Sequence, residues 1–382
     1  YLDLTQYDTA LAYYERCRAI FEQILPTQHP DLANLYMNIA NLYLDLTQYD
    51  TALAYYERCR AIFEQILPTQ HPDLANLYMN IANLYLDLTQ YDTALAYYER
   101  CRAIREQILP AQHPDLAGLY MNMATTYQSL TQYDTALAYY ERCRAIWEQI
   151  LPTQHPDLAR LCNNMAALYQ SLTQYDTALA YYERCRAIFE QILPPQHPSL
   201  ATLYMNMANT YNSLTECDSA LAYYERCRTI REQILPAQHP DLATLYMNMG
   251  NNYLHLTQYD TALAYYERCR TIREQILPTL HPDLAKLYMN IAIIYQRLAQ
   301  CDSALAYYER CRTIREQILP PQHPDLAILY GNMAVFYLNQ SQFPKAQIYI
   351  DRAFAIFQQI LPPEHPHLQK ALELQQRIHQ NL

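Results

Sequence analysis

Asparagine recurs at one position of the chain every 42 residues. The eight residues are Asn38, Asn80, Asn122, Asn164, Asn206, Asn248, Asn290 and Asn332. A carboxamide offers both a hydrogen-bond donor and an acceptor, so it can pair with main-chain N–H and C=O groups. Inside a helix, asparagine costs up to about 0.7 kcal/mol relative to alanine, which indicates a compensating interaction. One such interaction is a structural ladder, in which each amide bonds to side chains or carbonyls of the neighbouring helix.

Other polar residues share this helical face and vary between repeats; Asn41, for example, becomes Ile293, so duplication alone does not fix the face. If the face binds a ligand, we expect specificity from Asn41, Asp45, Asn83, Asp87, Arg160, Asn163, Asn209, Asn251, His255, Lys286 and Arg297. Residues 43–84 carry five acidic and two basic side chains, whereas residues 259–300 carry four and five. An acidic ligand segment should therefore prefer the C-terminal half, unless these charges are merely scattered and solvated.

Eleven cysteines and twelve histidines raise the question of a metal or redox site, which their spacing does not favour. Eight cysteines recur at one inward-facing position: Cys17, Cys59, Cys101, Cys143, Cys185, Cys227, Cys269 and Cys311. Packed helices lie about 8–10 Å apart, beyond the roughly 7 Å Cα limit of a disulfide, so we expect buried, unpaired thiols. The other three, Cys162, Cys217 and Cys301, each replace a repeated tyrosine. Nine loop histidines, from His29 to His365, each precede proline without further ligands nearby, which predicts a role at helix starts and no metal site.

No group of residues predicts catalysis. A nucleophile needs a base within hydrogen-bond reach and a third group to orient that base. Each repeated cysteine lies 12 residues from the nearest repeated histidine, as Cys17 does from His29. With only 3 glycines, a glycine-rich phosphate-binding loop is nearly excluded. We therefore expect a protein that is not an enzyme and that holds no cofactor.

The elements that carry these residues are pairs of helices. In the unit that begins at His29, Pro30 and Asp31 are typical of a helix start, because proline lacks only an amide that would have no partner and aspartate complements the helix dipole. The pattern predicts a first helix over about 30–46 and a second over about 50–67, followed by Pro68. Eight such pairs occupy 30–365. A truncated leading unit, 1–29, contains the tail of a first helix and a second helix over about 8–25, and a capping helix occupies 366–382.

The repeated residues resemble the tetratricopeptide (TPR) signature. Its positions are occupied by Tyr36, Ile39, Ala40, Tyr43, Tyr49, Ala52, Tyr56 and Cys59. The 42-residue unit, with its closing His-Pro-Asp-Leu-Ala, is similar to the units of kinesin light chains and their bacterial relatives. The resemblance implies an all-α TPR solenoid, a right-handed superhelix of antiparallel helix pairs forming one domain over 1–382. Two departures alter the expected turns: Thr47 stands where the family usually has glycine, and Pro68 stands where a Leu-Gly pair usually ends.

The resemblance also implies a function. Such arrays bind extended peptides along the concave face of their first helices, and an asparagine at the position of Asn38 grips the peptide backbone. We therefore expect a protein-interaction scaffold, with the structural ladder as the alternative role of the asparagines. Two other functions stay open: a sensor or autoinhibitory array of a larger signalling protein, and a structural spacer that self-associates end to end.

Composition and charge indicate which classes of partner are not expected. The net charge of −11 and the absence of Lys/Arg runs leave nothing to neutralise a phosphate backbone, so nucleic acid is not expected. No stretch approaches 18 apolar residues, so a membrane partner is not expected either. Many unpaired thiols are typical of a reducing compartment, which predicts a cytoplasmic location. Because the chain starts inside a repeat and lacks an initiator methionine, we expect a missing upstream segment or domain.

Overall fold

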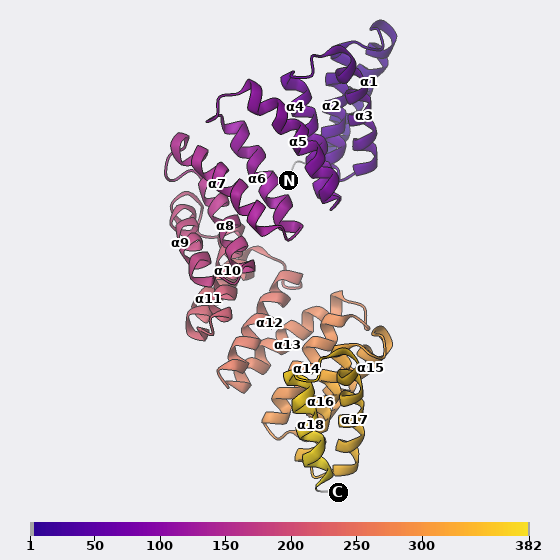
Figure 1. Ribbon diagram of the computed structural model, residues 1–382, viewed down its shortest axis with the longest axis vertical. Helices are drawn as coiled ribbons and strands as arrows, with labels where there is room; N and C mark the ends of the chain where they lie inside the picture. The colour runs from indigo at the N-terminus through magenta and orange to yellow at the C-terminus, as the bar shows by residue number, and fades with distance from the viewer. Residues whose placement is uncertain (1–3, 381–382) are drawn as a thin grey trace. The chain divides into compact units, whose positions relative to one another are not determined.

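The computed structural model describes residues 4–380, with side chains from residue 7, and 81% of the chain is helical. In this part the helices are α1 (Leu4–Ile24), α2 (Pro30–Asp45), α3 (Tyr49–Ile66), α4 (Pro72–Asp87), α5 (Tyr91–Ile108), α6 (Pro114–Ser129), α7 (Tyr133–Ile150), α8 (Pro156–Ser171), α9 (Tyr175–Ile192), α10 (Pro198–Ser213), α11 (Cys217–Ile234), α12 (Pro240–His255), α13 (Tyr259–Ile276), α14 (Pro282–Arg297), α15 (Cys301–Ile318), α16 (Pro324–Asn339), α17 (Phe343–Ile360) and α18 (Pro366–His379) (Figure 1). No strand occurs among these residues. The predicted all-α fold of consecutive antiparallel pairs is confirmed.

Each even-numbered helix begins with the same cap. The ring nitrogen Nδ1 of His29 accepts a hydrogen bond from the backbone N–H of Asp31, at 3.2 Å, and Pro30 occupies the first turn. All nine loop histidines up to His365 make this bond. The cap satisfies one of the amides that a helix start leaves without a partner. The predicted helix-start role of the histidines is therefore confirmed.

The turn inside each pair is made by a residue in the left-handed region. Thr47 has φ 58°, and its N–H donates to the carbonyl of Leu44, while the N–H of Gln48 donates to the carbonyl of Tyr43, both at 2.9 Å. These two bonds form the Schellman motif, which usually places glycine at this position. Its equivalents are Thr89, Thr131, Thr173, Thr215, Thr257, Ala299 and Ser341. The turn therefore has the geometry usual for glycine, although threonine, alanine or serine occupies the left-handed position.

The leading unit differs from the prediction. Residues 1–5 were expected to be the tail of a first helix, separated by a turn from a second helix starting near residue 8. Leu4 and Thr5 instead belong to α1, which runs without a break to Ile24. Residues 1–3 lie outside the described part.

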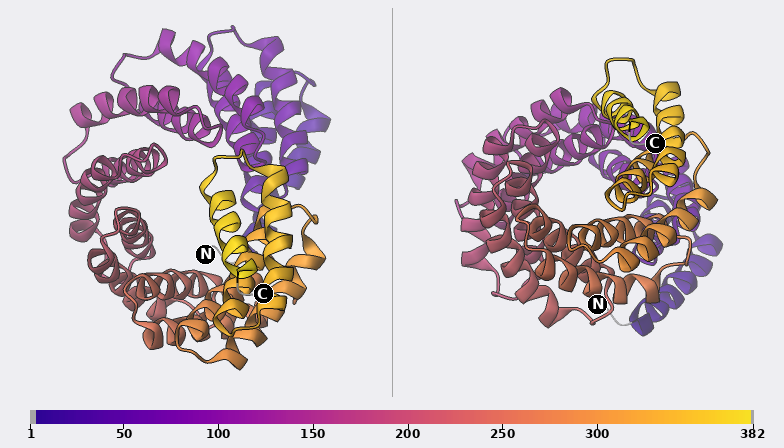
Figure 2. Two further views of the ribbon diagram at one scale, coloured as in Figure 1. Left: turned by 60° about the horizontal axis from the view of Figure 1, so that its bottom comes forward. Right: turned by 90° about the horizontal axis from the view of Figure 1, so that it is seen from below.

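The chain divides into two compact units, residues 1–193 and 194–382, and Figure 2 shows their helices from two further sides. Within each unit, even-numbered helices contact the next even-numbered helix, as α4 contacts α6 and α14 contacts α16. Neighbouring odd-numbered helices of the described residues are instead joined by long side chains, as Arg144 of α7 donates to the hydroxyl of Tyr181 of α9 at 2.7 Å, and their backbones approach less closely. In a curved stack the closer layer lies on the inside, so the even-numbered helices form the inner layer of each unit.

Buried side chains join successive pairs into continuous cores. Tyr56, Ala52 and Cys59 of α3 are completely buried, and their equivalents repeat this along the chain. Tyr55 of the same helix is also buried and stacks on Tyr43 of α2, with ring centroids 5.7 Å apart. Stacking of neighbours supplies the burial that one unit cannot provide alone. The cores therefore fix the register of the inner layer.

Candidate functional site

The asparagine row lies along the inner layer, one residue on each even-numbered helix from α2 to α16. Asn38 is exposed, and the other seven are half-buried. An exposed or half-buried amide at the same level of each helix is accessible to a ligand lying along the layer. The remaining question is whether the donor and acceptor of each amide are already bonded within the protein.

Four of the eight amides donate to an asparagine of the preceding even-numbered helix. Nδ2 of Asn290 donates to Oδ1 of Asn251 at 2.9 Å, and Nδ2 of Asn248 donates to Oδ1 of Asn209 at 3.1 Å. The same bond joins Asn122 to Asn83, at 3.0 Å, and Asn80 to Asn41, at 3.4 Å. The side-chain N–H groups of these four residues thus take part in a structural ladder. Their side-chain carbonyl oxygens accept no hydrogen bond within the described residues.

The acceptor asparagines also accept hydrogen bonds from buried tyrosine hydroxyls. Tyr266 of α13 is completely buried, and its hydroxyl donates to Oδ1 of Asn251 at 2.7 Å. Tyr224 donates to Asn209 in the same way, also at 2.7 Å. Burial raises the pKa of both tyrosines well above the ordinary value, so each hydroxyl stays a neutral donor. A buried hydroxyl without an acceptor would be costly, so these asparagines serve the fold.

In three of the repeats that lack the acceptor asparagine, a glutamine three residues later replaces it. Tyr308 donates to Oε1 of Gln296 at 2.6 Å, in the repeat where Ile293 replaces the asparagine. Gln128 and Gln170 accept from their tyrosines in the repeats that carry threonine and alanine at the asparagine position. The sequence analysis missed this substitution, although its signal is present: each of these glutamines accompanies the loss of an asparagine.

The glutamine-type repeats leave the neighbouring amide with weaker partners. Nδ2 of Asn332 reaches only the sulfur of Met289, at 3.6 Å. Nδ2 of Asn164 reaches the sulfur of Met121 at 3.9 Å and also interacts with the hydroxyl of Tyr140. Because a thioether is a weak acceptor, these two N–H groups are less occupied than those of the asparagine ladder.

The predicted specificity positions lie on the same layer. Asp45, Asp87, Arg160, His255, Lys286 and Arg297 are exposed, and Asn41, Asn83, Asn163, Asn209 and Asn251 are half-buried. Arg160 pairs with Asp157 at 3.0 Å and lies over the ring of Trp147. Lys286 and Arg297 make no ion pair within the described residues, so their charge is open to a ligand. The four acceptor asparagines among these positions are instead committed to the fold.

Most of the repeated thiols are shielded from solvent. Seven of the eight repeated cysteines are completely buried, and Cys17 is half-buried. Burial raises the pKa of Cys101 to about 11 and that of Cys59 to about 12, so both stay protonated near neutral pH. Within the described residues, no three His, Cys, Asp or Glu side chains come together in a way that could hold a metal ion.

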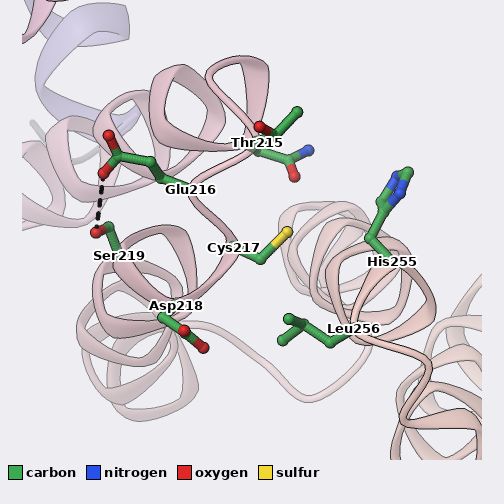
Figure 3. Close-up of a pocket in the computed structure, with 8 residues that line it drawn as sticks. Thr215, Glu216, Cys217, Asp218, Ser219, His255 and Leu256 are labelled. Carbon is green, nitrogen blue, oxygen red and sulfur yellow. Dashed lines mark hydrogen bonds between the residues drawn. The ribbon is translucent and has the colours of Figure 1, made fainter.

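One cavity of about 600 Å³ lies at the turn between α10 and α11 (Figure 3). It is lined by Cys217 at the start of α11 and by His255 at the end of α12. The other lining residues are Asn212, Thr215, Glu216, Asp218, Ser219 and Leu256. Cys217 takes the place of a repeated tyrosine. At the second such replacement, Gln340 donates to the sulfur of Cys301 at 2.8 Å.

The repeated helix pairs, the caps and the layered cores define an α-solenoid. The chain belongs to the tetratricopeptide repeat family, whose model matches residues 1–65, 31–107, 73–149, 115–191, 157–233, 199–275, 241–317 and 283–359. Proteins of this family generally mediate protein–protein interactions, and such scaffolds are generally without catalytic activity. A search of curated proteins finds no match. None of the helices in the described part has the length and apolar character needed to cross a membrane.

Solved structures share the fold. BtubC (BKLC) from P. vanneervenii is 23% identical, with a TM-score of 0.52 over 60% of this chain and 91% of the other. The apo form of RapI is 14% identical, with a TM-score of 0.65 over 91% and 98% of the two chains. A candidate kinesin light chain from Podosopora anserina, with nearly identical TPR-like repeats, is 24% identical over 54% and 97%, with a TM-score of 0.48. The family model confirms the predicted TPR family, and at these identities the structural similarities concern the fold alone.

Proposed function

We propose that the chain is a protein-interaction scaffold that holds an extended peptide segment of a partner along the inner layer. The observation that carries this proposal is the row of accessible carboxamides, one on each even-numbered helix from α2 to α16. Consecutive carboxamides at one level of the layer suit the regularly spaced N–H and C=O groups of an extended main chain.

Charge indicates which peptide segments each unit would prefer. Asp45 and Asp87 are exposed on the first helices of the layer, whereas Lys286 and Arg297 are exposed on α14. Opposite charges attract most strongly at low ionic strength, and exposed pairs contribute about 0.2–1 kcal/mol each. An acidic segment of a partner should therefore bind to α14 in the second unit, and a basic segment to α2 and α4 in the first unit.

A selection from a random dodecapeptide library displayed on phage, with the full chain as bait, tests the proposal. We expect enriched peptides that carry acidic residues towards one end. The reversal Lys286→Glu should weaken binding several-fold at 50 mM salt and much less at 500 mM, because screening removes the difference. The matched control is Lys345→Glu, on the odd-numbered helix α17, which should leave binding unchanged. Failure to enrich any peptide, or equal loss in both variants, would contradict this function.

A further inference from the structure

The inner face of α16 differs from that of every other described even-numbered helix from α2 to α14. Ile328, Gly331, Asn332 and Val335 lie three and four residues apart, so they share one face of the helix. Six of those helices carry methionine at the position of Gly331, and α8 carries Asn163. A Cβ atom added at Gly331 would meet no heavy atom within 4 Å. Glycine is disfavoured in a helix interior, and packing within the protein does not require it here.

The amide of Asn332 is the second unusual feature of this face. In the preceding repeat, Asn290 donates to Asn251 at 2.9 Å and lies 3.4 Å from the hydroxyl of Tyr266. Asn332 has neither partner, because Ile293 replaces the acceptor asparagine and Tyr308 donates to Gln296. Among the described residues, the only hydrogen-bond contact of the Asn332 amide is with the sulfur of Met289. Both the donor and the acceptor of Asn332 are therefore available to a ligand.

The surroundings of Gly331 are apolar, with positive charge nearby. Ile328 is 40% exposed, and Val335 and Ile293 are half-buried at positions where four other repeats carry asparagine. Lys286 and Arg297 are exposed on the adjacent helix α14. An uncovered apolar face beside a free carboxamide and two unpaired cations fits an extended, partly acidic peptide that also carries one large apolar side chain.

We infer that α14 and α16 form the part of the inner layer that recognises sequence in the bound peptide. Asn332 holds one peptide group through both atoms of its amide, and a large apolar side chain of the peptide lies over Gly331, against Ile328 and Val335. This inference rests on the proposed function. In the repeats whose amide already donates to another asparagine, binding a peptide group through both amide atoms would first break that internal hydrogen bond. The affinity contributed by such a repeat is therefore lower by about 2- to 10-fold.

Two pairs of variants test the inference, with peptides enriched on the wild-type chain as the probe and fluorescence polarisation as the assay. Gly331→Met restores the side chain common in the other repeats and should lower affinity at least about tenfold, because it fills the space proposed for the peptide. Gly118→Met in α6 is the control for added bulk on the inner layer, since a Cβ there also meets nothing within 4 Å, and its loss of affinity should be much smaller. Both variants should raise Tm, because methionine is the better helix former.

The second pair separates binding from stability. Asn332→Ala should lower affinity about five- to tenfold without lowering Tm, whereas Asn290→Ala should lower Tm with a smaller loss of affinity. Equal affinities of the Gly331→Met and Gly118→Met variants would overturn the inference while leaving the proposed function intact. The same holds if Asn332→Ala and Asn290→Ala behave alike. Enrichment of no peptide at all would instead count against the proposed function.

Discussion

Replacing Asn251 by isoleucine should destabilise the array, because two groups depend on its side-chain oxygen. Oδ1 of Asn251 accepts from the hydroxyl of Tyr266 at 2.7 Å and from the amide of Asn290 at 2.9 Å. Tyr266 is completely buried, so its hydroxyl cannot turn to water. An unsatisfied buried donor costs about 1–3 kcal/mol, and the lost amide bond costs about 0.5–1.5 kcal/mol. The expected loss in the free energy of unfolding is therefore about 2–4 kcal/mol, measured by urea denaturation.

The chain itself contains the repair. In α14, Ile293 occupies the equivalent position, and Gln296 accepts the tyrosine hydroxyl instead. Adding Leu254→Gln to Asn251→Ile copies that arrangement and should recover about 1–3 kcal/mol, the cost of the tyrosine hydroxyl alone. The reciprocal variant Gln296→Leu should lose a similar amount. The reasoning is refuted if Asn251→Ile is as stable as the wild type, or if the double variant is no more stable than the single one.

Three further outcomes follow from the turns and the thiols. Thr173→Gly should raise stability by about 1 kcal/mol, because it removes the strain of a left-handed side chain, whereas Thr173→Ala should give no comparable gain in urea denaturation. At pH 8, iodoacetamide should label Cys17, Cys217 and Cys301, while buried thiols such as Cys101 stay unlabelled by mass spectrometry; rapid labelling of Cys101 would contradict its burial. The pKa of Cys101 is raised from 9.0 to about 11, so its contribution to stability is complete below pH 9 and is lost as the pH rises to 11. Thermal unfolding should therefore show a falling Tm across that interval, and a constant Tm would refute it.

The helix pairs could be predicted from the sequence because their signals are local. Proline after each loop histidine, with aspartate after most of them, marks the helix starts, and the recurring apolar residues mark the buried faces. The burial of the repeated cysteines followed from the same spacing, and the structure confirms it for seven of the eight. The start of α1 carries no such histidine–proline signal, and α1 begins at Leu4 instead of near residue 8.

The different roles of the asparagines were not predicted, because they depend on contacts between helices. Nothing in the local sequence says that the hydroxyl of Tyr266 reaches the layer of Asn251, 15 residues earlier. That contact shows why Gln128, Gln170 and Gln296 are present: each accepts the tyrosine hydroxyl where the asparagine is missing. Gly331 was overlooked for a similar reason, since the sequence alone does not tell whether a small residue is required by packing or leaves space for a ligand.

The most direct test of the interaction-scaffold function is a crystal structure of the full chain with a peptide selected from the library. The account predicts that the peptide lies extended along the even-numbered helices, with its main chain bonded to the carboxamide of Asn332. A peptide bound to the odd-numbered helices or to the histidine loops, with the asparagine row left bare, would contradict it.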